Sequence, residues 1–173
     1  MKSIHLIAPS GASLDSKSPL AGINWLEGQG IAVENTDCVN RVYERFAGSD
    51  DARLAELNHL SKLDPHVLVM AMRGGYGLHR LLPGVEWDGI AKAIQNGLQV
   101  CGHSDFTVFQ LGLLAKTGAI TLAGPMLNFD FGRLGDDGAA AIPDAFMWEH
   151  FQDAVQNRKL ECKTVTPQSF LGK

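Results

Sequence analysis

The chain has 173 residues, a length that suits one globular domain and disfavours two full ones. Hydrophobic residues make up 45% and charged residues 20%, a balance that supplies a core and argues against disorder. The 15 basic and 19 acidic residues give a net charge of −4, so neither a nucleic acid nor an anionic membrane is an expected partner. No apolar run approaches the ~20 residues that a membrane-spanning helix needs.

Apolar strands and amphipathic helices alternate along the chain. Strands are predicted at residues 4–8, 31–33, 67–71, 98–101 and 120–122, with a last short one at 161–165. Helical stretches are predicted at residues 19–27, 50–60, 78–82, 87–95, 106–116 and 145–156. Residues 128–144 are rich in Gly and Asp and are expected to form a long surface loop.

Capping residues mark several of these helix ends. Ser18 is expected to cap the first helix, with Pro19 at its first position. Ser49 is expected to cap the second, and acidic residues follow it at the positive end of the helix dipole. Gly118 is expected to end the helix at 106–116.

The run Val67-Leu68-Val69-Met70-Ala71 is apolar on both alternating faces, which is typical of a strand buried on both sides in a parallel sheet. The order of strands and helices predicts the α/β class: a Rossmann-like or flavodoxin-like parallel sheet with helices on both faces and right-handed crossovers. Ligands bind at the carboxyl ends of the strands in this architecture, so we look there for a site.

The sharpest local feature is the segment Gly102-His103-Ser104-Asp105-Phe106, where a buried strand runs directly into an amphipathic helix. A serine at such a bend resembles a nucleophile elbow, in which the helix dipole and the N–H group of Asp105 favour a developing oxyanion. Phe106 replaces the second glycine of the G-x-S-x-G pattern. The alternative is that Ser104 only caps the helix, since serine is among the best N-cap residues.

A glycine-rich segment, Arg73-Gly74-Gly75-Tyr76-Gly77, follows the most buried strand. Its backbone N–H groups can approach a ligand closely, and we choose Gly75 as the second oxyanion donor. The same loop could cradle a phosphate or be an ordinary turn. It matches neither the dinucleotide fingerprint nor a Walker loop.

A serine nucleophile needs a base, and none of the six histidines is convincingly placed to serve as one. His103 is adjacent to Ser104, so its side chain should point away and act as a structural neighbour. Cys101 is expected to be a small buried apolar residue. The three cysteines form no CxxC pair, so neither a disulfide framework nor a zinc knuckle is indicated. No cofactor is expected.

Five motifs in this order, spread over most of the chain, resemble the N-terminal domain of the LD-carboxypeptidases, the muramoyltetrapeptide carboxypeptidases of serine peptidase family S66. The motifs are Ile7-Ala8-Pro9-Ser10-Gly11, Arg45-Phe46-Ala47-Gly48, Arg73-Gly74-Gly75-Tyr76-Gly77, Gly102-His103-Ser104-Asp105-Phe106-Thr107 and Gly124-Pro125-Met126.

This resemblance implies a cytoplasmic serine carboxypeptidase that needs no metal and releases the terminal D-alanine from murein tetrapeptides in peptidoglycan recycling. Ser104 would be the nucleophile, and the N–H groups of Asp105 and Gly75 would form the oxyanion hole. The substrate-proximal residues implied in the same way are Arg73, Gly74 and Tyr76.

The resemblance also implies that residues 1–160 are the nucleophile domain and that 161–173 begin a linker to a C-terminal domain absent from this chain. Family members take their catalytic His and Glu from that domain and are homodimers when full-length. The chain is therefore expected to lack both residues and to be an inactive half of the enzyme.

Two other functions stay open at this stage. One is a microcin-immunity-type S66 peptidase that acts on peptidyl-nucleotide conjugates. The other is a non-catalytic α/β module that binds an anionic ligand through the glycine-rich loop.

Overall fold

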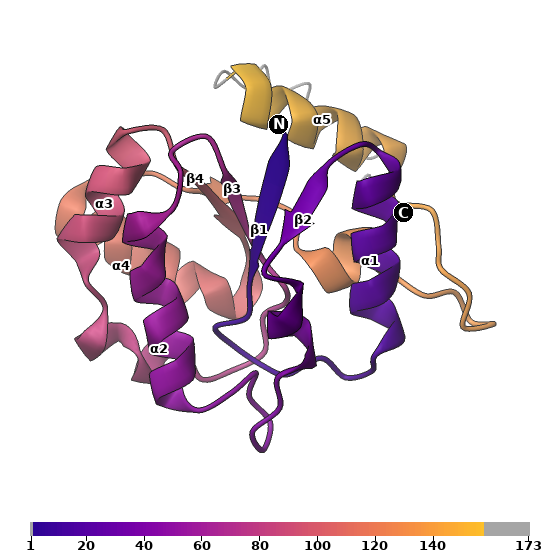
Figure 1. Cartoon of the computed structure of the whole chain (residues 1–173), viewed down its shortest axis with the longest axis horizontal. Coiled ribbons are helices and arrows are strands. Elements are labelled where there is room, and N and C mark those ends of the chain that lie inside the picture. The colour runs from indigo at the N-terminus through magenta and orange to yellow at the C-terminus, as the bar shows by residue number, and fades with distance from the viewer. Residues whose placement is uncertain (1, 158–173) are drawn as a thin grey trace, which may run out of the picture.

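The computed structural model describes residues 2–157, which form one five-stranded sheet flanked by helices (Figure 1). The strands are β1 (Ser3–Ile7), β2 (Ala32–Glu34), β3 (Leu68–Ala71), β4 (Gln99–Gly102) and β5 (Leu122–Ala123). The α-helices are α1 (Lys17–Gly28), α2 (Asp50–His59), α3 (Trp87–Gln95), α4 (Thr107–Thr117) and α5 (Ala145–Asn157).

All strand pairs are parallel, and the strand order is β2-β1-β3-β4-β5. This is the flavodoxin-like order of a doubly wound sheet, so the predicted fold class is confirmed. The direction of winding reverses between β1 and β3. A crevice for ligands is expected at the carboxyl ends of these two strands.

Helices cover both faces of the sheet, with α2, α3 and α4 on one side and α1 on the other (Figure 1). The central strand β3 contributes to both layers because successive side chains alternate between faces. Val69 and Ala71 pack in the core beneath α2, α3 and α4. Leu68 and Met70 pack in the core that includes α1 and α5. A strand buried on both faces is what the apolar run at 67–71 predicts.

The predicted elements agree with the observed ones at most positions. The strands lie within two residues of their predicted bounds, and α3 spans the predicted residues 87–95. Gly118 ends α4 in the left-handed region at φ +73°. The strand predicted at 161–165 lies outside the described residues. No helix within residues 2–157 is long and apolar enough to cross a membrane.

The two predicted N-caps have different outcomes. Ser49 caps α2, since its side chain accepts the N–H of Ala52 at 3.2 Å. The prediction for Ser18 is wrong, because α1 already begins at Lys17. A carboxylate oxygen of Asp15 accepts the N–H groups of Lys17 and Ser18 at 2.8 and 2.7 Å. Asp15, and not Ser18, therefore satisfies free N–H groups at the start of this helix.

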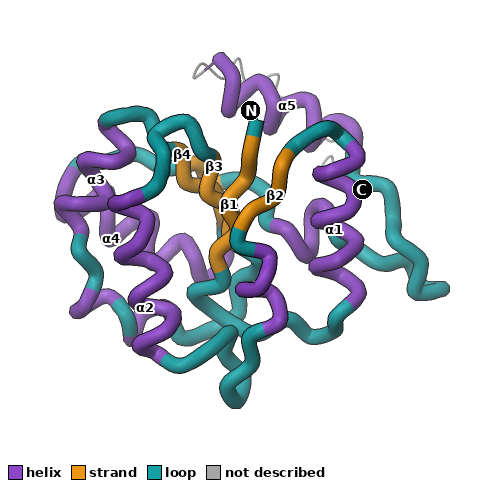
Figure 2. The backbone as a smooth tube through the Cα atoms, in the orientation of Figure 1, coloured by secondary structure: helices purple, strands orange, loops and turns teal. Residues whose placement is uncertain are grey.

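The surface loop predicted at 128–144 is also partly wrong. Leu127–Phe131 forms one turn of π-helix, with both end residues buried against α1. Glycines permit this close approach: a Cβ atom at Gly132 would lie 2.0 Å from the carbonyl oxygen of Ser18, and one at Gly22 would lie 2.9 Å from Leu127. The remaining residues up to 144 form a loop (Figure 2).

A buried arginine holds the loop after β1 in place. The side chain of Arg53, on α2, is fully buried and donates to the carbonyl oxygens of Pro9 at 2.7 Å and Gly48 at 3.2 Å. Its guanidinium also pairs with Asp50 and lies 4.6 Å from the ring centroid of Phe46. The loop that carries Ser10 and Gly11 is thereby fixed to the helix layer.

Candidate active site

The five motif segments meet at the carboxyl edge of the sheet. The N–H of Gly11, after β1, donates to the carbonyl oxygen of Gly74, after β3, at 3.2 Å. The N–H of Ala47 bonds to the same β1 loop, and Gly124, after β5, donates to Gly102 of β4. These hydrogen bonds join the first three motif segments in one group and the last two in another, both at the same edge of the sheet.

Ser104 lies at the bend between β4 and α4, as predicted. Its φ angle is +60°, it is one of three non-glycine residues with positive φ among those described, and it is exposed. A left-handed non-glycine residue is strained, and such residues concentrate at functional sites. The bend is sharp because Gly102 leaves room for the buried ring of Phe106; a Cβ atom at Gly102 would lie 2.6 Å from that ring.

The helix-capping interpretation of Ser104 is wrong. Its hydroxyl makes no hydrogen bond to any residue in the described range 2–157, and the cap position of α4 is Phe106, which has no side-chain acceptor. Asp105 contributes a local restraint instead. Its Oδ2 accepts the N–H of Leu78 at 3.2 Å, which ties the start of the helix to the end of the glycine-rich loop.

The glycine-rich loop lies directly against Ser104. A Cβ atom at Gly74 would lie 2.7 Å from both Cβ and Oγ of Ser104 and 3.1 Å from the backbone nitrogen of Asp105. Gly75, which we chose as the second oxyanion donor, has φ +120° and packs against Gly11. The predicted residues are therefore brought together, with Gly74 in contact with the hydroxyl. The role of Gly75 as a donor stays a prediction.

Gly74→Ala is expected to displace the Ser104 hydroxyl, because the new methyl group occupies space that the serine side chain now fills. Misplacement of a reacting group by about 1 Å costs roughly 100-fold in rate. We therefore expect the Gly74→Ala variant to turn over a peptide substrate with a loss of that size while the protein stays folded. The matched control is Gly28→Ala, since a Cβ atom there meets nothing within 4 Å. Equal turnover in the two variants, with circular dichroism unchanged, would contradict the close packing.

All six histidines lie within residues 2–157, and none of them is hydrogen bonded to the Ser104 hydroxyl. His103 Nε2 lies 3.3 Å from Asp130 Oδ2, a contact that fits its prediction as a structural neighbour. The exposed ring of Tyr76 has its centroid 5.0 Å from that of His79.

Arg73 spans the crevice between β1 and β3. Its Nη1 donates to the carbonyl oxygen of Ala12 at 2.9 Å, and its Cζ lies 5.7 Å from the ring centroid of Phe129. Partial burial lowers the pKa of this guanidinium below its usual value. The sequence placed the loop that begins with Arg73 after a buried strand, at the edge of the sheet where ligands bind, and the resemblance added that its side chain is close to the substrate.

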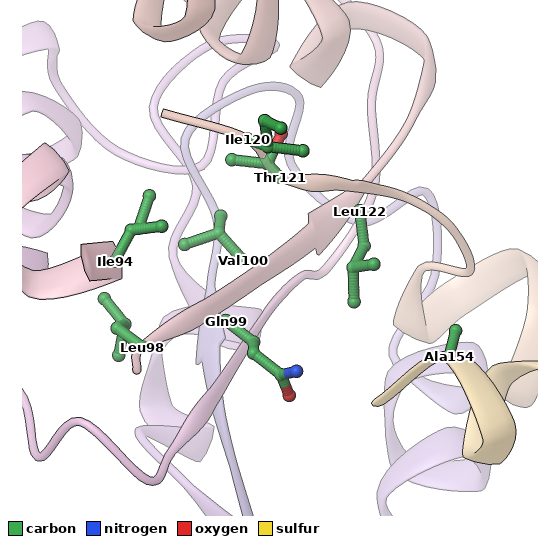
Figure 3. Close-up of a pocket in the computed structure, with 8 residues that line it drawn as sticks. All are labelled: Ile94, Leu98, Gln99, Val100, Ile120, Thr121, Leu122 and Ala154. Atoms are coloured by element: carbon green, nitrogen blue, oxygen red, sulfur yellow. The ribbon is translucent and has the colours of Figure 1, made fainter. Parts of the chain in front are cut away.

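An apolar cavity of about 410 Å³ lies elsewhere and does not belong to this site. It is formed between α3, β4, β5 and α5 (Figure 3). Leu98 and Gln99 line it at the start of β4, whereas Ser104 follows the end of that strand. Cys101 is buried as predicted, and burial raises the pKa of its thiol. Among residues 2–157, no three side chains of metal-ligating type are grouped to hold an ion.

The doubly wound parallel sheet, with an exposed, left-handed serine between a strand and a helix, has the backbone geometry of a nucleophile elbow on an α/β domain. Residues 4–124 match the family model of the LD-carboxypeptidase N-terminal domain of peptidase family S66. The chain belongs to this family.

The chain is also similar to curated proteins whose names are in line with this family. The chain is 30% identical over 129 residues to the "Probable murein peptide carboxypeptidase" of Bacillus subtilis (strain 168), an alignment that covers 75% of this chain and 39% of the relative. It is 31% identical over 112 residues to the "Microcin C7 self-immunity protein MccF" of Escherichia coli, covering 65% and 32%.

Among solved structures, the chain is similar to muramoyltetrapeptide carboxypeptidase from Oxalobacter formigenes. The identity is 37% and the TM-score 0.72, with 88% of this chain and 47% of that chain covered. The chain thus spans less than half the length of the relatives it matches.

Proposed function

We propose that this chain is the nucleophile-bearing domain of a serine LD-carboxypeptidase that releases the terminal D-alanine from murein tetrapeptides. The observation that carries the proposal is Ser104, exposed in a left-handed bend and held against Gly74. The family match over residues 4–124 and the names of the relatives supply the peptide class. Peptidoglycan recycling in the cytoplasm is the setting that this activity suggests.

In the proposed reaction, the Ser104 hydroxyl attacks the carbonyl carbon of the bond before D-alanine. The oxyanion receives hydrogen bonds from the N–H groups of Asp105 and Gly75, and D-alanine leaves with the proton that the serine gives up. Arg73, Gly74 and Tyr76 surround the peptide. The acyl enzyme is then hydrolysed by water, which restores the serine.

The base that removes the serine proton is proposed to come from a C-terminal domain, together with its orienting Glu. In this arrangement residues 1–160 form the nucleophile domain, 161–173 begin the linker, and the complete protein is a homodimer. General-base assistance contributes about 10²–10⁴-fold, so residues 1–173 alone are expected to turn over substrate poorly.

The test is whether the protein as the cell makes it releases D-alanine from a murein tetrapeptide, with the products measured by mass spectrometry. We expect cleavage after the L-centre only when the last residue is D-alanine; cleavage that favours an L-alanine terminus would contradict the proposal.

A second candidate is favoured by the 31% identity to the microcin immunity protein. Faster hydrolysis of an aspartyl sulfamoyl adenosine than of the tetrapeptide would select that function, and binding without turnover of either would select an anion-binding module.

A further inference from the structure

Arg73 carries a positive charge that no carboxylate of residues 2–157 offsets. Three other arginines pair with acidic side chains: Arg41 with Glu56, and Arg53 and Arg80 with Asp50. The guanidinium of Arg73 makes one hydrogen bond to a described residue, from Nη1 to a backbone carbonyl. A partly buried cation loses hydration without gaining a counter-ion, so the binding of an anion there is favoured.

The position of this charge relates it to Ser104. A Cβ atom at Gly74 would lie 2.7 Å from the serine hydroxyl, and one at the next residue, Gly75, would lie 3.7 Å from Nη2 of Arg73. The hydroxyl and the guanidinium therefore lie beside adjacent residues of one glycine-rich loop. A peptide bond held at Ser104 would place the C-terminal residue of the peptide beside the same loop.

Space for such a residue adjoins Arg73. A cavity of about 270 Å³ is lined by Arg73, Asn128, Phe129 and Arg133 and by the start of α1. Its volume lies below the range typical of drug-sized ligands. Asp15 also lines it and brings a negative charge, which is stabilised by hydrogen bonds from the N–H groups of Lys17 and Ser18 and from the Ser18 hydroxyl. Arg133 brings a second positive charge to the same cavity. The guanidinium lies over the ring of Phe129, with its Cζ 5.7 Å from the ring centroid.

We propose that Arg73 binds the free α-carboxylate of the C-terminal residue of the peptide. This inference rests on the proposed function and adds the group that makes the enzyme a carboxypeptidase. The guanidinium supplies paired N–H donors to the carboxylate and fixes the last peptide bond opposite Ser104. A peptide that continues beyond this residue, or that ends in an amide, lacks the anion and is held in place less well.

The first experiment compares acetyl-L-lysyl-D-alanine with its C-terminal amide as substrates of the protein as the cell makes it. We expect the native protein to prefer the acid. Arg73→Met should reduce the acid-to-amide ratio of kcat/KM values by about 10- to 100-fold, because only the kcat/KM for the acid falls. Arg73→Lys should restore part of the ratio. Arg80→Met, which removes an exposed arginine that pairs with Asp50 and does not line this cavity, is the matched control and should leave the ratio nearly unchanged.

A second experiment separates this inference from the proposed function. Binding of the same acid and amide is measured by calorimetry in a Ser104→Ala background, where no turnover is needed. We expect the acid to bind at least about tenfold more tightly than the amide, and Arg73→Met to remove the difference. Absence of D-alanine release by the native protein would refute the proposed function only. Equal binding of acid and amide, or the same loss of preference in the Arg80→Met variant, would overturn the role of Arg73.

Discussion

Ser104→Ala is expected to reduce D-alanine release by at least about 10³-fold, because the substitution removes the only atom that we assign to bond formation. The measurement is the initial rate of release from a murein tetrapeptide by the protein as the cell makes it, because residues 1–173 alone are expected to turn over substrate poorly. Ser61→Ala is the matched control: its hydroxyl donates to the carbonyl oxygen of Asn58 near the end of α2, away from the strand ends that surround Ser104. A Ser104→Ala enzyme with more than a tenth of the native rate would refute the nucleophile assignment.

Ser104→Gly adds a test of the strained bend. Glycine populates φ near +60° freely, whereas alanine is strained there by about 1–2 kcal/mol. Both variants should be inactive, and the glycine variant should be the more stable of the two in urea denaturation by about 1 kcal/mol. If the alanine variant were the more stable, the left-handed conformation of residue 104 would be contradicted.

Arg53→Met is expected to lower the free energy of unfolding by about 3 kcal/mol, because the carbonyl oxygens of Pro9 and Gly48 lose a charged donor inside the protein. Urea denaturation measures the change. Arg80→Met is a close control, since Arg80 pairs with the same Asp50 and also lies over the Phe46 ring.

The two arginines differ in burial. The side chain of Arg53 is 0% exposed and that of Arg80 is 48% exposed. An exposed ion pair contributes less than about 1 kcal/mol, so the Arg80 variant should be near native stability. Similar losses in both variants would show that the shared contacts with Asp50 and Phe46, and not the buried carbonyl oxygens, determine the stability.

The sequence patterns located the elements well where the signal was local. The apolar run at 67–71 and the helical spacing at 87–95 depend on neighbouring residues, and both correspond to observed elements. The π-turn at Leu127–Phe131 was missed because it depends on a tertiary contact. Gly22 of α1 and Gly132 permit that contact, and nothing in the local composition distinguishes them from glycines of a flexible loop.

The candidate site, like the fold, could be predicted only in part. Parallel topology alone places the segments after β3 and β4 at one edge, and the structure brings Gly74 and Ser104 into contact there. The left-handed φ of Ser104 was not predictable, since it results from packing of Phe106 on Gly102 and of Gly74 on the serine. The register of the glycine loop, with Gly75 against Gly11, likewise depends on distant backbone.

Within residues 2–157, the two outer strands of the sheet are very short: β2 has three residues and β5 has two. A strand at the border of a sheet exposes unpaired backbone groups that invite another chain to continue the ladder. Strands as short as β2 and β5 present few free N–H and C=O groups, so another strand can form few hydrogen bonds with them. The sheet thereby carries a built-in resistance to fibril-like growth, even though its central strands are among the most apolar parts of the sequence.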